Sequence, residues 1–131
     1  MYKPALTAGA LFAGLAVIFG AFGAHVLKAV VSPDQLMVFE TGVRYQFYHS
    51  FALLAAGIIF PSFPFKTVKL AAVFFIIGII LFSGSLYAMV LLSINGSSIG
   101  PAGMLTPIGG LFFITGWILF ILSIIKKAKL Q

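Results

Sequence analysis

The uncharged stretch LAAVFFIIGIILFSGSLYAMVLLSI, residues 70–94, decides the fold class of this chain. A helix rises 1.5 Å per residue, so a run of this length crosses the ~30 Å hydrocarbon core of a bilayer. The whole chain of 131 residues is 62% hydrophobic and only 8% charged, whereas soluble domains carry about a quarter charged residues. A soluble globule of this size could not bury so much apolar surface. The sequence therefore predicts a small integral membrane protein.

Three further apolar runs accompany this stretch, and each ends at prolines or at charged residues. Spans are expected over about 5–27, 45–60, 70–94 and 107–125. Pro4 and Pro107 suit a first helical turn, where the missing N–H has no partner in any case, and Thr106 is a plausible N-cap. The prediction is an all-α membrane protein: a single domain, residues 1–131, with four transmembrane helices in a bundle.

The first run has one alternative interpretation, a cleaved signal peptide. Lys3 would be its short basic region, and Ala21-Phe22-Gly23 would be its small-residue cleavage site. The apolar part of a signal peptide is only about 7–15 residues long. The run over 5–27 is longer than that, which favours a transmembrane helix.

The segment between the first two spans carries a helix-start signal of its own. Ser32 followed by Pro33, with Gln35 at the third helical position, is typical of a capping box. An apolar stripe at helical spacing follows, made of Leu36, Phe39, Val43 and Phe47. We expect a short amphipathic helix over about 33–43 at the outer membrane surface, bending near Gly42. One long helix from Pro33 to Phe60 is the alternative.

The net charge of +6 at pH 7 indicates orientation, not nucleic-acid binding. The basic residues form no dense stripe; they stand where apolar runs stop. With four spans, both termini share one side with the second loop. That side holds Lys3, Lys66, Lys69, Lys126, Lys127 and Lys129, and the other holds Lys28 and Arg44. Cytoplasmic segments carry the Lys/Arg excess, so we expect a multi-pass protein of the plasma (inner) membrane with both termini cytoplasmic.

Most polar side chains of the spans lie toward their outer ends, which predicts one connected polar cluster in the outer half of the bundle. Tyr87 is expected to donate a hydrogen bond to His49, with Ser83 one turn deeper. Glu40 and Arg44, an i,i+4 pair, are placed at the rim. The full candidate set is His25, Glu40, Arg44, Gln46, His49, Ser83, Tyr87 and Thr106.

Several roles for this cluster stay open at the level of sequence. The favoured role is structural, in which polar groups hydrogen-bond between helices because lipid offers no partner. A transport or small-molecule binding site is the alternative, since intramembrane ionisable groups are often functional. A third possibility is a redox subunit, with haem between His25 and His49 or a metal on these histidines and Glu40.

Other features of the sequence point away from catalysis. The chain has no cysteine, and no Ser-His-Asp set or phosphate-binding loop is visible. We therefore expect no catalytic residue, no metal and no cofactor, and a non-enzymatic structural or accessory role. The expected partners are the lipid bilayer and either a membrane protein or a second copy. A flank of small residues could pack inside the protein or against that copy: Gly9, Ala13, Ala16, Gly20 and Ala24.

Four blocks occur in order along the chain. They are Gly20-Ala21-Phe22-Gly23-Ala24-His25, Tyr45-Gln46-Phe47-Tyr48-His49, Phe82-Ser83-Gly84-Ser85-Leu86-Tyr87, and Thr106-Pro107-Ile108-Gly109-Gly110 with Gly116-Trp117. In these blocks the sequence resembles the bacterial YgdD/YwdK-like family of small four-helix inner-membrane proteins, a domain of unknown function with a small eukaryotic transmembrane relative. The resemblance implies a four-span inner-membrane protein and brings no established substrate or reaction.

Overall fold

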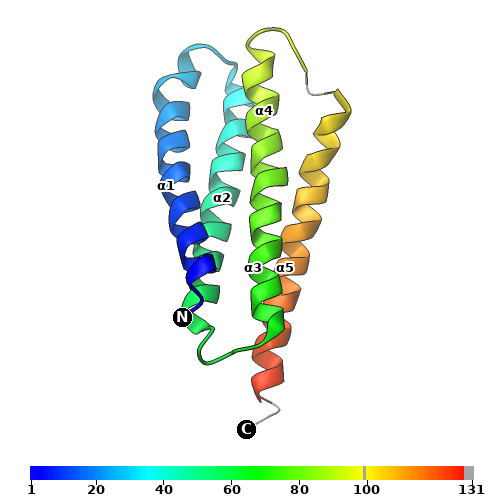
Figure 1. Cartoon of the computed structure of the whole chain (residues 1–131). Coiled ribbons are helices and arrows are strands. Elements are labelled where there is room, and N and C mark those ends of the chain that lie inside the picture. The colour runs from blue at the N-terminus through cyan, green and yellow to red at the C-terminus, as the bar shows by residue number, and fades with distance from the viewer. Residues whose placement is uncertain (99, 129–131) are drawn as a thin grey trace.

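The computed structural model describes residues 1–98 and 100–128, without the side chains of 127 and 128. Long helices run up and down in alternation (Figure 1), and the described residues contain no strand. Their bounds are α1 Lys3–His25, α2 Pro33–Ile59, α3 Lys66–Gly78, α4 Gly84–Ser93 and α5 Leu105–Ala128. A π-helical turn, η2 (Ile79–Ser83), joins α3 to α4 in one rod, and two short turns, η1 (Leu27–Ala29) and η3 (Gly100–Met104), lie in the loops. The predicted all-α class is confirmed.

Three helical segments are long and apolar enough to cross a membrane: Lys3–Ala29, Lys66–Ser93 and Gly100–Lys126. They correspond to the first, third and fourth predicted spans. Within the described chain, α2 is not among them, since it carries Asp34, Glu40 and Arg44 besides several uncharged polar residues. Helix α5 begins at Leu105, so Thr106 lies inside its first turn and is not the N-cap that we expected.

Helix α2 is continuous from Pro33 to Ile59, so the separate surface helix over 33–43 was wrong and the alternative of one long helix holds. The predicted capping box is confirmed: Ser32 and Gln35 exchange hydrogen bonds of 3.0 and 3.2 Å. The helix passes Gly42 without interruption, and the α3–α4 rod packs against it there. The Tyr87 ring covers Gly42, and the Ser83 hydroxyl donates to the Gly42 carbonyl.

This continuity changes the position of the polar residues along α2. Gln46 is the central residue of Pro33–Ile59, and His49 lies one turn beyond it. We expected both in the first turns of a shorter span that began at Tyr45. They lie instead half-way along a long helix. The hydrogen bond from Gln46 to the Phe12 carbonyl shows that this part of α2 is level with the middle of α1.

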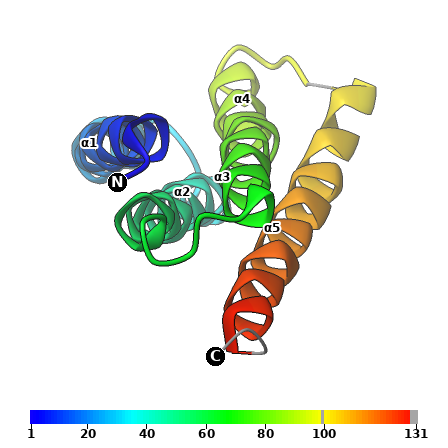
Figure 2. The same ribbon diagram turned by 60° about the horizontal axis from the view of Figure 1, so that its bottom comes forward.

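The helices form an open row and do not close into a ring. Viewed toward one end, α1 packs on α2, α2 packs on the α3–α4 rod, and the rod packs on α5 (Figure 2). Helices α1 and α5 lie at opposite ends of this row. The N-terminus, the loop between α2 and α3, and the C-terminal end of α5 lie at the same end of the molecule (Figure 1). Lys129, one of the six basic residues counted for that side, lies outside the described residues.

Close helix contacts depend on small residues, as expected for helices in lipid. Gly9 of α1 faces the Ser50 carbonyl of α2, and a Cβ there would lie 2.9 Å from that oxygen. Ala16 of the same flank is fully buried, so this part of the flank packs inside the protein. Gly109 of α5 lies directly against the backbone of Phe82 in the π-helical turn, where a Cβ would overlap the Phe82 backbone.

Candidate functional site

A chain of hydrogen bonds through Gln46 connects three helices. The Tyr87 hydroxyl of α4 donates to Gln46 Oε1 at 2.8 Å, and Gln46 Nε2 donates to the Phe12 carbonyl of α1 at 2.8 Å. Ser83 adds a bond of 2.7 Å to the Gly42 carbonyl. We call these groups the Gln46 network: Phe12 carbonyl, Gly42 carbonyl, Gln46, Ser83 and Tyr87. Gln46 is 2% exposed and Ser83 is fully buried.

The Gln46 network has no spare polar group in its interior. Ser50, also fully buried, donates to the Gln46 carbonyl at 2.6 Å. Among the described residues, every buried side-chain nitrogen and oxygen has a hydrogen-bond partner. Because a polar group facing lipid tails has no partner, this arrangement is what a structural connection between helices requires.

His49 belongs to a different contact, on the side of α2 that faces α5. Its Nδ1 lies 2.7 Å from the Tyr45 carbonyl, and the Trp117 indole N–H donates to its Nε2 at 3.2 Å. A carbonyl only accepts and an indole N–H only donates, so Nδ1 carries the proton, Nε2 carries none, and the ring is neutral. The ring stacks on Phe113 with centroids 3.4 Å apart and an angle of 7°.

The expected hydrogen bond from Tyr87 to His49 is therefore wrong. Residues 46 and 49 stand three apart, which turns them by about 60° around a helix with 3.6 residues per turn. Gln46 faces α1 and α4, whereas His49 faces α5, so Tyr87 reaches Gln46 and Trp117 reaches His49.

The remaining candidates do not join either contact, so the single cluster that we expected is divided. His25 is exposed at the last position of α1, and Glu40 is exposed on α2. Arg44 is also exposed and donates to the Thr41 hydroxyl at 3.1 Å. Thr106 shares a hydrogen bond of 2.6 Å with Ser85, which connects α5 to α4.

Several partners in these contacts were not found from the sequence, among them Ser85, Trp117 and the Phe12 carbonyl. Trp117 stood in a recognised block but was given no role, although an indole N–H in the middle of a span needs an acceptor. The Phe12 carbonyl has no sequence signal at all, since every residue carries that group.

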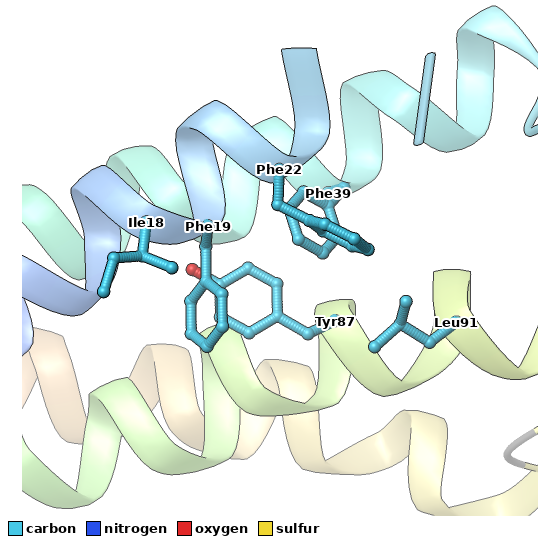
Figure 3. Close-up of a pocket in the computed structure, with 6 residues that line it drawn as sticks. All are labelled: Ile18, Phe19, Phe22, Phe39, Tyr87 and Leu91. Atoms are coloured by element: carbon cyan, nitrogen blue, oxygen red, sulfur yellow. The ribbon is translucent and has the colours of Figure 1, made fainter. Parts of the chain in front are cut away.

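Two of the grooves on the surface of the row lie beside these hydrogen-bonded contacts. The larger, about 560 Å³, lies between α2 and α5; we call it the α2–α5 groove. It is lined by Tyr45, Tyr48, His49, Phe82, Gly110, Phe113, Ile114 and Trp117. The other, about 280 Å³, lies between α1 and α4 and is entirely apolar. In Figure 3, the Tyr87 ring crosses this second groove from α4 toward α1, with its hydroxyl end beside Phe19.

The sequence-based ligand sets are not assembled by this fold. His25 is at the end of α1, whereas His49 is half-way along α2 with both ring nitrogens engaged. The proposed haem pair and the set of two histidines with Glu40 are thus not brought together. No group of three potential metal-ligating side chains is found among the described residues.

Apolar helices of spanning length, held together by buried polar side chains, define an integral membrane protein. Residues 19–110 match a family described as a protein of unknown function, DUF423. The chain belongs to this family.

Two relatives that match most of the chain are named as membrane proteins. The chain is 45% identical to UPF0382 membrane protein SAB0533 of Staphylococcus aureus, over 92% of this chain and 93% of the relative. It is 40% identical to UPF0382 membrane protein YwdK of Bacillus subtilis, over 90% and 93%. No solved structure matches it. The resemblance seen in the sequence blocks is confirmed.

Proposed function

We propose that this protein is a non-enzymatic, four-span protein of the plasma (inner) membrane that acts as a structural or accessory partner of another membrane component. The main support for this proposal is the Gln46 network. Its polar groups satisfy one another, and Gln46 and Ser83 are buried, which suits a structural role. An accessory protein then contacts its partner through its lateral faces.

In this proposal α2 is the fourth span. Three of its polar side chains near the middle, Gln46, His49 and Ser50, are buried and hydrogen-bonded to neighbouring groups. Between Arg44 and the C-terminal end of α2, the outward face of the helix carries Tyr48, Phe51 and Ile58. All three side chains are exposed and mainly apolar. A helix that carries buried polar groups can cross lipid when those groups are satisfied within the protein, and α2 has the length to do so.

The proposed orientation places both termini in the cytoplasm. The end of the molecule that holds the N-terminus also holds Lys69 over the rings of Tyr2 and Phe60, and Lys126 over Phe65. Lysines beside aromatic rings at a span end suit a membrane–water interface on the cytoplasmic side.

Reporter fusions test both the fourth span and the orientation. Alkaline phosphatase, which is active only outside the cytoplasm, should be inactive when fused after Gln131 and active when inserted at Ser98. Insertion at Ser62, in the loop between α2 and α3, should be inactive. Insertion at Val30, in the loop between α1 and α2, should be active. If α2 does not span, Val30 and Ser62 report the same side, whereas the reverse pattern at all four sites contradicts the orientation.

The alternative role in transport has a direct test. Liposomes that contain the purified protein and an internal pH-sensitive dye should keep a proton gradient as long as protein-free liposomes do. A faster decay that Gln46→Leu abolishes would support transport through the network and overturn the structural proposal.

A further inference from the structure

The α2–α5 groove holds polar groups that the fold itself does not use. Tyr45 and Tyr48 are 39% and 57% exposed, and both line the groove near the middle of α2. Within the part of the chain that the structure describes, neither hydroxyl makes a hydrogen bond. Tyrosines of membrane proteins gather at the membrane surfaces, where water satisfies them. Two unsatisfied hydroxyls half-way along a spanning helix therefore call for a polar group supplied by something else.

The walls of the groove are flat aromatic rings. Tyr45 packs on Phe82 with centroids 4.7 Å apart, and Phe113 stacks on His49. Trp117, 41% exposed, forms the far edge, where its indole N–H meets His49 Nε2. A planar ring fits between such walls by offset or edge-to-face contacts.

The volume and chemistry of the groove select among lipid-soluble molecules. About 560 Å³ lies within the usual range of small-molecule pockets. A saturated acyl chain offers no atom to the two hydroxyls, and a phospholipid headgroup stays at the membrane surface. A ring that carries oxygens on an apolar tail satisfies the hydroxyls and the aromatic walls together.

We propose that the α2–α5 groove binds a lipid-soluble quinone or quinol. Its ring lies beside Tyr45, Tyr48 and Trp117, the tyrosine hydroxyls hydrogen-bond to its oxygens, and its isoprenoid or alkyl tail continues into the bilayer. The proposal concerns binding only. It rests on the four-span insertion proposed above, which the phosphatase fusions test separately.

Trp117 is the only tryptophan of the chain, so its fluorescence reports directly from the groove. We would titrate the full-length protein in lipid nanodiscs with decylubiquinone, a quinone with a short alkyl tail. The expected result is saturable quenching of Trp117 emission at a few quinones per protein.

A pair of glycine substitutions provides a matched test of the site. Gly110→Leu should abolish the saturable quenching, because Gly110 lines the groove and its Cβ would meet only Phe82 Cδ2, at 3.9 Å. Gly84→Leu should leave the quenching unchanged, since nothing lies within 4 Å of a Cβ at Gly84.

A second variant does not depend on filling space. Exchanging both tyrosines, Tyr45→Phe with Tyr48→Phe, keeps the rings and should weaken quinone binding about tenfold through the loss of two hydrogen bonds. Quenching that rises linearly without saturation overturns the proposal. Equal quenching in Gly110→Leu, or unchanged affinity in the tyrosine pair, also overturns it. Saturable quenching by a phosphatidylcholine with brominated chains, competing with the quinone, would assign the groove to an acyl chain instead.

Discussion

Gln46 determines how three helices meet at a single position. Its amide uses both ends, accepting from Tyr87 and donating to the Phe12 carbonyl. Interhelical hydrogen bonds in membranes are worth roughly 0.6–2 kcal/mol each, and a buried group left without a partner costs about 1–3 kcal/mol. The loss of one side chain here therefore has more than a local effect.

We predict that Gln46→Leu lowers the free energy of unfolding by about 1–3 kcal/mol, because it removes two bonds and leaves the Tyr87 hydroxyl unpaired. Thermal unfolding in detergent, followed by circular dichroism, should show a lower Tm. Thr115→Val is the control: it deletes a hydroxyl bonded only to Leu111 of its own helix and should change Tm little. Equal Tm values for Gln46→Leu and the parent protein contradict the role of the network.

A double-mutant cycle isolates the bond between Gln46 and Tyr87. Tyr87→Phe keeps the ring that packs on Phe19 and Phe39 and removes only the hydroxyl. If the hydrogen bond between Tyr87 and Gln46 accounts for most of the stability lost in each single variant, the destabilisation of the double variant should be smaller than the sum of the two single destabilisations. Strict additivity of the two losses would show that the two side chains contribute independently.

The sequence identified five interhelical polar residues but not their pairing. Gln46, His49, Ser83, Tyr87 and Thr106 all form bonds between helices. They could be identified because polar groups in an apolar run need partners. Their pairing depends on how α2 is rotated about its axis, and the continuous helix, which was only the alternative, sets that rotation and their depth.

At the scale of elements, one contact explains an irregularity in the longest rod. The π-helical turn η2 lies where α5 passes, and Gly109 packs directly on the Phe82 backbone. The composition of residues 79–83 gives no sign of such a turn, since its need arises from a neighbouring helix. Helix starts were more predictable: the Ser32 capping box depends only on residues close in sequence.

Gly109→Ala should therefore be strongly destabilising, by about 1–3 kcal/mol, as is usual for overpacking, because the new methyl group overlaps Phe82. Gly84→Ala, on the α3–α4 rod that Gly109 contacts, provides the comparison. Its Cβ meets nothing within 4 Å, and alanine is the better helix former by up to ~1 kcal/mol. Tm values in detergent should fall for the first and stay level or rise for the second. An equal change in Tm for both variants would contradict the importance of the contact between Gly109 and the Phe82 backbone.

At the scale of the whole molecule, the alternation of helices was predictable and their lateral arrangement was not. Short connections force neighbouring helices to run antiparallel, and charge at the span ends indicates a side. Nothing in the sequence says whether four helices close into a ring. The contacts between helices determine the open row. Two hydrogen bonds join α5 to the α3–α4 rod at two different levels, one between Ser85 and Thr106 and one between Thr67 and Ser123.

Disulfide cross-linking can test this open row, because the chain has no cysteine of its own. Ser85 and Thr106 oxygens are 2.6 Å apart, and those of Thr67 and Ser123 are 2.7 Å apart, so cysteines at either pair should oxidise readily. A pair at Val17 and Ile118, exposed on α1 and α5, should stay reduced in the monomer. Non-reducing electrophoresis and mass spectrometry of membranes treated with oxidant distinguish the outcomes. An intramolecular bond between positions 17 and 118 requires α1 and α5 to meet, and a closed bundle would then replace the open row.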